Sequence, residues 1–589
     1  MYSPDIILIF PPMFNPGEIY LALPSLKAYL ETHGYKAQVL DVNVIINDII
    51  LSKKFLEKVL LEYGENVRAS LPESEINTLI NNVDHAKQIL RSEDFYLKEQ
   101  YLTALHIIRR AMELIDKIFK PYGGLLIESF GAYRYQQDSK EVAKLITQNK
   151  TIYSILYDEY IVSEILKSNT KLVGISITFS DQLIPSLLLA RKLKDYDKHF
   201  SIVVGGNLVT HLHRNESFLR LLSLAGVDAA VIFEGEYALL KIVEVFDKNR
   251  ESLKTSLCEI PNVIYLDANR YKLPEKIYVV KDLNDIPTPN FDDLPLDKYL
   301  TPHIVFPLLT SRGCYWSKCV FCNIPYGYYK YRFRDVEHVI NDIKLLISKY
   351  NAKYIAFRDC CIPPEYMYEL SKRIIEEGIE VKMYAEIRAE ETFRYEHFKT
   401  AYEAGFRVLW VGVESYSQRI LNLMRKGITR EGIRRCLEFM KKAGMWVHVY
   451  IILGFPGETE EDLYETINFI LTNHNIDSVE FSPFSLVENS PIILEGIAEK
   501  YGIVLKGKDY DLSLVYRYVL KDVPLQGENR KINEYINRIY SNEAQSFFNL
   551  VIPSYGTWLL LYVSKCGVNA TKKVLQTLIS SFNEVPNEN

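Results

Sequence analysis

Three cysteines within nine positions constrain this chain more than any other feature of its sequence. Cys314, Cys319 and Cys322 lie in the stretch 310–323. A deprotonated cysteine is a soft ligand, and soft ligands select zinc or iron–sulfur centres. Three thiolates are one short of the four that close a tetrahedral site. The triplet therefore indicates a 4Fe–4S cluster that keeps one iron open for a substrate, with a zinc knuckle or unligated buried cysteines as alternatives.

The composition limits the class of protein. A chain of 589 residues is too long for one core, so roughly two to four domains are expected. The formal net charge is −6, from 69 basic and 75 acidic residues, and gives no reason to expect nucleic acid as a partner. No apolar run reaches the roughly 18–20 residues of a transmembrane segment, and no signal sequence precedes the first strand-like run. Because eight cysteines in so long a chain do not form a disulfide scaffold, we expect a cytoplasmic protein.

Residues 1–285 have the alternating pattern of an α/β domain. Five short apolar runs predict parallel strands, at 6–10, 37–41, 172–178, 202–204 and 228–232. Residues from about 44 to 168 interrupt this pattern with helical periodicity and little strand signal. They predict a helical insertion, which is either a lid without chemistry of its own or a cover for a ligand-binding edge.

Small and polar residues follow the predicted strands at their carboxyl ends. They are Pro12, Ser176, Thr178, Phe179, Ser180, Gly205, Gly206, Asn207, Thr210, Glu234, Gly235 and Glu236. In a doubly wound sheet, ligands bind outside the carboxyl ends of the strands. Glycines at that edge let a flat or bulky ligand approach the backbone. These residues are therefore the candidate ligand contacts of the first domain.

A second alternating region follows a polar, proline-rich linker at residues 286–300. Residues 301–490 alternate strand-like and helical stretches in six β/α units, which predict a partial barrel with its chemistry at the carboxyl ends of the strands. Residues 491–589 have helical patterns, and the apolar run 558–563 predicts a buried helix. This last region is expected to cap the barrel or to recognise the substrate.

The cysteine stretch resembles the cluster loop of radical S-adenosylmethionine (SAM) enzymes. The residues Thr-Ser-Arg-Gly before Cys314 resemble the cobalamin-binding branch of that family. The usual family spacing is Cys-x3-Cys-x2-Cys, whereas this chain has Cys-x4-Cys-x2-Cys, so one extra residue lengthens the first loop and leaves the number of thiolates unchanged. Upstream, the order Pro-Pro, Gly-x-Ser-x-Thr, Val-Gly-Gly and Glu-Gly-Glu resembles the cobalamin-binding domain that precedes many radical SAM cores.

This resemblance implies a Rossmann- or flavodoxin-like cobalamin-binding domain with a helical insertion, then a partial (β/α)6 radical SAM barrel and a mostly helical C-terminal region. Cys314, Cys319 and Cys322 would bind the 4Fe–4S cluster, and the edge residues named above would contact cobalamin. Seven residues at strand ends would contact SAM: Asp359, Glu386, Arg388, Gly412, Glu414, Ser415 and Lys426. No Asp-x-His-x-x-Gly motif supplies a histidine below the cobalt.

Plainer roles compete at several of these positions. Asp359 is expected to accept a hydrogen bond from the SAM ammonium, and alternatively pairs with the preceding arginine. Glu414 alternatively caps the next helix, and Lys426 is alternatively solvated. The adjacent Cys360 and Cys361 are expected to be small buried side chains rather than ligands.

The resemblance leads to three hypotheses for the function. The first is a C-methyltransferase that acts on an unactivated carbon with a 5′-deoxyadenosyl radical and methylcobalamin. The second is a cobalamin-assisted radical cyclisation or rearrangement without methyl transfer. The third is a cobalamin- or metal-binding sensor without turnover. An external electron donor is expected as a partner, and the substrate class stays open between a peptide, a lipid and a small metabolite.

Overall fold

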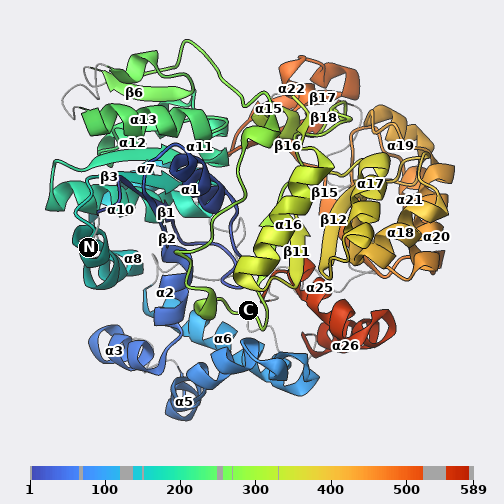
Figure 1. Cartoon of the computed structure of the whole chain (residues 1–589), viewed down its shortest axis with the longest axis horizontal. Coiled ribbons are helices and arrows are strands. Elements are labelled where there is room, and N and C mark those ends of the chain that lie inside the picture. Colours follow the sequence, from blue (N-terminus) through green and yellow to red (C-terminus); the bar gives the residue numbers. More distant parts are fainter. Residues whose placement is uncertain are drawn as a thin grey trace. The chain divides into compact units, whose positions relative to one another are not determined.

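The computed structural model describes residues 3–65, 71–119, 137–148, 151–248, 256–267, 270–328, 330–521 and 552–582. The chain divides into two units, which are described separately here (Figure 1). The first unit comprises Met1–Lys281, Asp285–Pro302 and Tyr510–Ser513, and the second comprises Asp282–Asn284, His303–Asp509 and Leu514–Asn589. Within the described ranges, no helix combines the length and the apolar character needed to cross a bilayer.

A mostly parallel sheet forms the centre of the first unit. Its described strands follow the order β2-β1-β3-β4-β5-β6-β7. They are β1 (Ile6–Phe10), β2 (Ala37–Asp41), β3 (Leu172–Ser176), β4 (Ser201–Gly205), β5 (Ala229–Val231), β6 (Val263–Asp267) and β7 (Arg270–Lys272). The first five pair in parallel, in the strand order of flavodoxin-like folds. The antiparallel β6 and β7, which the sequence analysis did not predict, extend the sheet at its β5 edge.

Burial explains why these segments form strands. Every residue of β1 and of β3 is buried, as expected for strands covered on both faces of a parallel sheet. The helices that follow β1, β3, β4 and β5 in the sequence are α1 (Ala22–Thr32), α10 (Leu183–Tyr196), α11 (Asn207–Leu212), α12 (Glu216–Leu224) and α13 (Glu236–Lys248). Helix α1 packs against α13, and α10 packs against α12. The predicted α/β fold of this unit is therefore confirmed.

The insertion between β2 and β3 is helical, as predicted. Its described helices are α2 (Val42–Ile50), α3 (Lys53–Tyr63), α5 (Glu73–Leu90), α6 (Lys98–Ile118), α7 (Ser139–Gln148), α8 (Ile152–Leu156) and α9 (Val162–Lys167). Helix α6 packs against α5 with an apolar stripe that includes Tyr101, Leu105 and Ile108, all buried. Residues 66–70, 120–136 and 149–150 of the predicted insertion lie outside the described residues.

The segment predicted as a linker belongs to the first unit. Phe291 and Tyr299 are fully or almost fully buried there, and the Tyr299 hydroxyl donates to the Asp41 carboxylate at 2.6 Å. The Asp293 carboxylate accepts from the backbone N–H of Val39 at 2.9 Å. Proline and acidic residues predicted an exposed connection, but two aromatic side chains anchor this segment to the unit.

The second unit is built on a parallel sheet with the order β15-β14-β13-β12-β11-β8 among the described residues. Its strands are β8 (Val305–Leu308), β11 (Tyr354–Phe357), β12 (Lys382–Arg388), β13 (Phe406–Glu414), β14 (Trp446–Leu453) and β15 (Ser478–Pro483). The connecting helices are α16 (Val336–Tyr350), α17 (Pro364–Glu376), α18 (Tyr395–Ala404), α19 (Gln418–Leu423), α20 (Arg430–Ala443) and α21 (Glu460–Thr472). Helices α17, α18, α20 and α21 line one side of this sheet, as the predicted partial barrel requires (Figure 1).

Left-handed residues end the helices that lead into the barrel strands. Helix α16 ends at Asn351 with φ 53°, α18 at Gly405 with φ 114° and α20 at Gly444 with φ 94°. Glycine adopts this conformation without the steric cost that a Cβ brings. A Cβ on Gly405 would lie 2.0 Å from the carbonyl oxygen of Val381. Only glycine therefore fits the turn that delivers β13.

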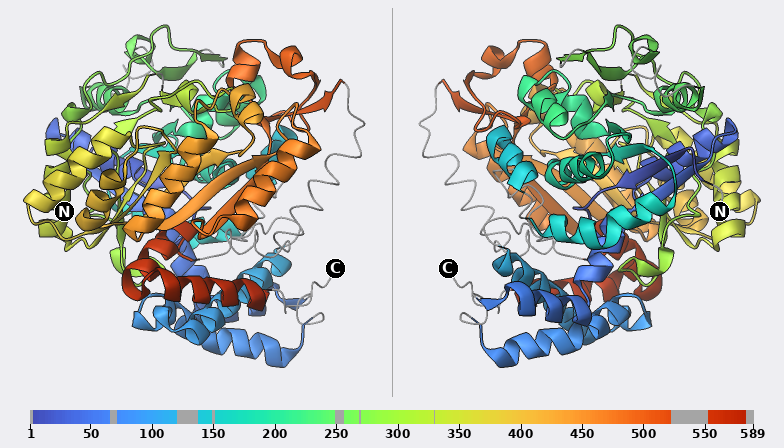
Figure 2. Two further views of the ribbon diagram at one scale, coloured as in Figure 1. Left: turned by 90° about the vertical axis from the view of Figure 1, so that its right-hand side faces the viewer. Right: turned by 90° about the vertical axis from the view of Figure 1, so that its left-hand side faces the viewer.

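The region after residue 490 is mostly helical, as predicted, and also contains strands. Helices α22 (Pro491–Leu494), α25 (Tyr555–Cys566) and α26 (Val568–Phe582) accompany a small sheet of β16 (Leu486–Val487), β17 (Ile503–Gly507) and β18 (Val515–Leu520). Strands β17 and β18 were not predicted. Leu505 of β17 and Val515 of β18 are exposed, so these strands lack the pattern of a buried strand. Figure 2 shows α25 and α26 in red. Residues 522–551 and 583–589 of the predicted cap lie outside the described residues.

Candidate functional site

The predicted cluster and SAM residues meet at one edge of the barrel sheet. Strand β8 leads into the short strand β9 (Ser311–Arg312) and then into the cysteine loop. Glu386 and Arg388 lie at the carboxyl end of β12, and Arg388 pairs with Gly412 of β13. The carboxyl ends of parallel neighbours lie at the same edge, which is where barrels carry out their chemistry.

Asp359, just beyond β11, fixes the start of the cysteine loop. Its Oδ1 accepts hydrogen bonds from the Thr310 hydroxyl at 2.7 Å and the Ser311 hydroxyl at 2.6 Å, and its Oδ2 accepts from the Thr310 backbone N–H at 3.0 Å. Burial raises the pKa of Asp359, and these donors oppose the rise. With 3% of its surface exposed, the carboxylate faces the loop. The Arg358 guanidinium lies over the Tyr384 ring, 5.4 Å from its centroid.

The extra residue of the Cys-x4-Cys spacing is accommodated by a tight turn. Ser317 adopts φ 51°, and its hydroxyl donates to the carbonyl oxygen of Cys314. The Trp316 indole N–H donates to the carbonyl oxygen of Arg425 at 2.8 Å. A Cβ on Gly427 would lie 1.9 Å from Cζ2 of Trp316, so the indole ring packs directly on the glycine backbone. The longer loop therefore folds back on the turn after α19.

Two cations lie near the thiols of the loop, Arg388 and Lys426, and each is paired with a carboxylate. Arg388 Nη1 is 3.9 Å from Cys319 Sγ, and the Arg388 guanidinium is 4.7 Å from the centroid of Trp316. The Cys361 thiol, 3.5 Å from Cys314 Sγ, together with the loop backbone and Arg388, lowers the pKa of Cys314 to about 5. Burial raises the pKa of Cys322 to about 12. A bound cluster would replace these protons with iron.

The donor set suits an iron–sulfur cluster. Once deprotonated, the three thiols are soft, anionic ligands of the kind that hold such a cluster, and a guanidinium lies near them. Within the described ranges, no three His, Cys, Asp or Glu side chains converge on a point that would hold one metal ion. A cluster distributes its cysteine ligands over several iron atoms, so it does not require that convergence.

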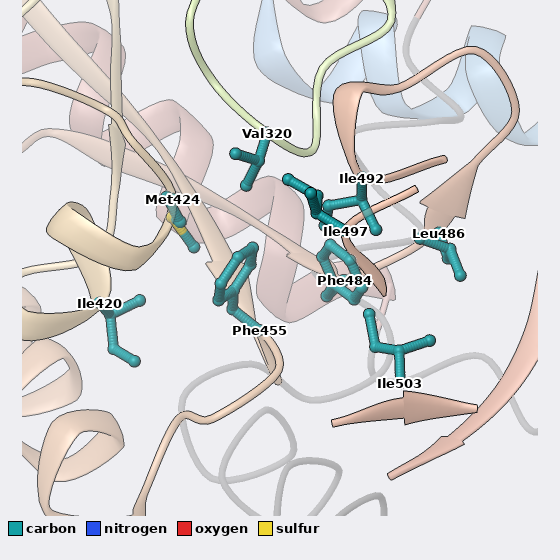
Figure 3. Close-up of a cluster of buried hydrophobic side chains, with 9 residues drawn as sticks. All are labelled: Val320, Ile420, Met424, Phe455, Phe484, Leu486, Ile492, Ile497 and Ile503. Atoms are coloured by element: carbon teal, nitrogen blue, oxygen red, sulfur yellow. The ribbon is translucent and has the colours of Figure 1, made fainter. Parts of the chain in front are cut away.

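A hydrophobic cluster supports the cysteine loop from behind (Figure 3). Its buried members are Val320, Ile420, Met424, Phe455, Phe484, Leu486, Ile492, Ile497 and Ile503. Val320 lies between two of the predicted ligands, and its N–H donates to the carbonyl of Met424 at 3.1 Å. Its own carbonyl accepts from the N–H of Ile492, also at 3.1 Å. Segments far apart in the sequence therefore hold the loop.

Glu414 and Lys426 form a buried ion pair beside the loop. Lys426 Nζ is 2.8 Å from Glu414 Oε1, and their side chains are 7% and 11% exposed. Burial lowers the pKa of Lys426, but Glu414 and Cys319 raise it, so the net shift is upward. Because Lys426 is buried and paired with Glu414, the alternative expectation of a solvated side chain is wrong. Glu414 has φ 65°, a strained conformation that costs roughly 1–3 kcal/mol and is concentrated at functional sites.

Gly412 leaves room for this ion pair. A Cβ at that position would lie 2.9 Å from Lys426 Nζ and 3.0 Å from Glu414 Oε1. Ser415, in contrast, is fully buried, and its Oγ lies 3.1 Å from Thr466 Oγ1. Gly412, Glu414 and Lys426 are therefore brought together, whereas the Ser415 hydroxyl bonds to helix α21.

The strands also carry aromatic and ionisable side chains along one face of the sheet. Glu386 pairs in register with Trp410, and Trp410 pairs with His448. Burial raises the pKa of Glu386 to about 7. Helix α25 covers this face, because Tyr555 contacts Trp410 with ring centroids 6.1 Å apart. The apolar run 558–563 predicted the helix, but no sequence signal indicated where it would pack.

The carboxyl edge of the first unit combines an aromatic shelf with polar side chains. The Phe179 ring is 36% exposed and stacks on Phe14 with centroids 5.6 Å apart. The Thr178 hydroxyl donates to Tyr20 Oη at 2.9 Å and lies 3.4 Å from Ser176 Oγ. Pro12, at the end of β1, is buried, and Ser180 is half-buried.

The edge continues past β4 and β5. Gly206 has φ 113°, and a Cβ there would lie 2.5 Å from the carbonyl oxygen of Ile177, so only glycine fits. Gly205 and Gly235 are half-buried, and Asn207 is exposed. Three further predicted residues are buried and stabilise the edge: Thr210 accepts from the N–H of Phe233 at 2.8 Å, Glu234 accepts from the N–H of Val280 at 2.7 Å, and Glu236 begins α13.

Comparison with known proteins identifies the barrel. The model of the radical SAM superfamily matches residues 308–470. An uncharacterized methyltransferase of Pyrococcus horikoshii is 30% identical over 322 residues, which cover 54% of this chain and 67% of that protein. The chain belongs to the radical SAM superfamily. It is therefore an enzyme, and the sensor hypothesis is set aside.

More distant relatives of this radical SAM enzyme include the anaerobic magnesium-protoporphyrin IX monomethyl ester cyclase of Rubrivivax gelatinosus. That protein is 23% identical over 343 residues, which cover 56% of this chain and only 58% of the cyclase. Two solved structures share the fold along almost the whole chain. The cobalamin-dependent SAM radical enzyme OxsB, with aqua-cobalamin bound, covers 100% of this chain and 74% of its own at TM-score 0.61 and 15% identity. The radical SAM methyltransferase TsrM of Kitasatospora setae, with cobalamin and a [4Fe-4S] cluster, covers 98% and 99% at TM-score 0.55 and 14% identity.

Proposed function

We propose that this radical SAM enzyme binds cobalamin at the carboxyl edge of its first unit and transfers a methyl group to an unactivated carbon. One observation supports the proposal most. The fold likeness to OxsB and TsrM covers at least 98% of the chain, so it includes the first unit as well as the barrel. Both of those structures contain bound cobalamin.

In the second unit, Cys314, Cys319 and Cys322 would hold the cluster. Bound together, the cluster and SAM supply a radical that removes hydrogen, and cobalamin supplies the methyl group. Asp359 holds the loop through Thr310 and Ser311, so we assign it to positioning in place of the expected contact with the SAM ammonium. Arg388 places positive charge beside the cysteines, where it offsets the negative charge of the thiolates.

The Glu414–Lys426 pair and Gly412 are the proposed contacts for the nucleoside of SAM. A buried ion pair provides fixed donors and acceptors, and the missing side chain at Gly412 makes room for that pair beside the strand. Glu386 faces the same edge as a second proposed SAM contact. Ser415 would support this site through its contact with Thr466.

In the first unit, the exposed Phe179 and Asn207 and the half-buried Ser180 and Gly205 are the proposed contacts for the corrin and its side groups. An aromatic ring such as that of Phe179 packs well against an apolar face of a ligand, and glycine lets a large ligand approach the backbone closely. Ser176 and Thr178 would line the edge between β1 and β3. The buried Thr210, Glu234 and Glu236 would keep its shape.

Anaerobic production of the full chain tests this proposal. Iron, sulfide and corrin should co-purify, and incubation with SAM, methylcobalamin and a strong reductant should yield S-adenosylhomocysteine and 5′-deoxyadenosine. The methylated product is then sought in extracts of the host organism by transfer of a deuterated methyl group. If 5′-deoxyadenosine forms but S-adenosylhomocysteine does not, and no deuterated methyl group reaches a product, methylation is contradicted. Cys319→Ala should abolish cluster binding, and Cys436→Ala, a buried cysteine on α20, is the matched control.

A second candidate is radical cyclisation or rearrangement without methyl transfer. The cyclase name of the Rubrivivax gelatinosus relative favours it. The same labelled incubation separates the two candidates. Deuterium from the SAM methyl group reaches the product in methylation and stays out of it in cyclisation.

A further inference from the structure

Two adjacent cysteines outside the cluster motif follow strand β11. Cys361 Sγ lies 3.5 Å from Sγ of the predicted ligand Cys314, a distance that allows a sulfur hydrogen bond. The Cys361 side chain is 2% exposed, so water does not compete for this contact. The preceding Cys360 is half-buried and provides a matched position one residue away.

The backbone fixes the position of Cys361. On one side, the N–H of Arg358 donates to the carbonyl of Leu308 at 2.8 Å. On the other side, the N–H of Ile362 donates to the carbonyl of Glu386 at 2.9 Å. The segment 358–362 is therefore held to β8 and to β12, which leaves the Cys361 thiol little freedom to move away from the loop.

The charges of the two sulfurs decide what the contact does. As an iron ligand, Cys314 is a thiolate. A second thiolate at 3.5 Å would be repelled, whereas a neutral thiol can donate its S–H to the charged sulfur. We propose that Cys361 is a positioning residue that donates a hydrogen bond to the Cys314 sulfur and raises the reduction potential of the cluster. This inference rests on the cluster of the proposed function.

Hydrogen bonds to ligand sulfurs are among the factors that set the potential of an iron–sulfur cluster. Reduction adds negative charge to the cluster, and a donor to one of its sulfurs stabilises that charge. Without the Cys361 donor, the cluster would be harder to reduce, and the electron donor of the enzyme would have to be a stronger reductant.

Potentiometric titration of the anaerobic full chain tests this inference, with the reduced cluster followed by electron paramagnetic resonance. We expect Cys361→Ala to shift the midpoint potential to a more negative value with unchanged iron and sulfide content. Cys361→Ser, which keeps a donor, should fall between the wild type and Cys361→Ala. Cys360→Ala should match the wild type.

Three results would overturn the inference. An unchanged potential in Cys361→Ala, or an equal shift in Cys360→Ala, would show that the Cys361 donor does not tune the cluster. Loss of iron in Cys361→Ala would make Cys361 a ligand instead of a donor. A wild-type chain without iron and sulfide would remove the proposed function itself, whereas a cluster with unchanged potentials would remove only this inference.

Discussion

At the scale of single residues, two carboxylates of the site, Asp359 and Glu386, have different surroundings. Asp359 accepts hydrogen bonds from the start of the cysteine loop, whereas Glu386 lies at the strand ends with Arg358 as its main nearby positive charge. The first carboxylate therefore has a structural role that can be removed by one substitution. The second exchanges a proton near neutral pH.

Asp359→Asn should weaken the cysteine loop, because the amide nitrogen cannot accept the hydrogen bonds that a carboxylate accepts. Hydrogen bonds to a charged group contribute roughly 1.5–3 kcal/mol, so we expect a loss of stability of that size and less retained iron. Iron analysis and urea unfolding measure both effects. Asp195→Asn, at a side chain that is 69% exposed, is the control. Full iron content with weakened SAM binding would instead favour a contact between Asp359 and the SAM ammonium.

Glu386 should give the folded chain a distinct dependence on pH. Burial raises its pKa from 4.5 to about 7, so between these values the folded chain keeps a proton that the unfolded chain has lost. Stability contributed by this group therefore falls as the pH rises through that window. Glu386→Gln should reduce the fall in unfolding free energy between about pH 5 and pH 7.5. Glu403→Gln, at an exposed position, should keep it, and equal slopes in all three proteins would contradict this expectation.

At the scale of elements, the turns between helices and strands decide where the site residues lie. Gly405 ends α18 and starts β13, the strand that carries Gly412 and Glu414. Gly378, after α17, also has a positive φ, of 62°, but a Cβ there meets nothing within 4 Å. Substitution of the two glycines therefore distinguishes the cost of backbone strain alone from the cost of strain plus a steric clash.

Gly378→Ala should cost only the left-handed penalty, about 1–2 kcal/mol. Gly405→Ala should cost clearly more, because its Cβ would lie 2.0 Å from the carbonyl oxygen of Val381. Urea unfolding of both variants provides the comparison. Equal midpoints would mean that β12 and β13 adjust to remove the clash.

The sequence predicted elements better than contacts. The run that became β1 is apolar throughout and the run that became β3 is apolar up to Ser176, and this pattern indicates a buried parallel strand. The partners of Asp359 were not predictable, because they depend on which strand lies beside β11. The packing of Trp316 on Gly427 was also missed, since it joins positions distant in sequence. Residue types thus indicated the chemistry, while the fold decided which side chains face a ligand.

At the scale of the whole molecule, the region after residue 490 supports the cysteine loop through hydrophobic packing. Ile492 and Leu494 lie on the same short helix, α22, with 0% and 58% exposure. Only Ile492 belongs to the hydrophobic cluster behind the cysteine loop. Substitutions of these two residues therefore test whether the hydrophobic cluster supports the cysteine loop.

Ile492→Ala should destabilise the second unit by roughly 2–5 kcal/mol, because it leaves a cavity in the core. It should also reduce iron retention, since the Ile492 side chain belongs to the same hydrophobic cluster as Val320 of the cysteine loop. Leu494→Ala should change stability by no more than about 0.5 kcal/mol. Denaturation midpoints and iron content check both statements, and equal iron retention in the two variants would contradict the proposed support.

The pairing of Val320 with Ile492 also orders events during biosynthesis. While the ribosome is still translating the barrel, the cysteine loop lacks the partner in α22 that completes its hydrogen bonding. The nascent chain must emerge beyond residue 492 before its three thiols reach their final arrangement. In the proposed cluster enzyme, delivery of iron and sulfide would therefore follow synthesis of the segment up to residue 492.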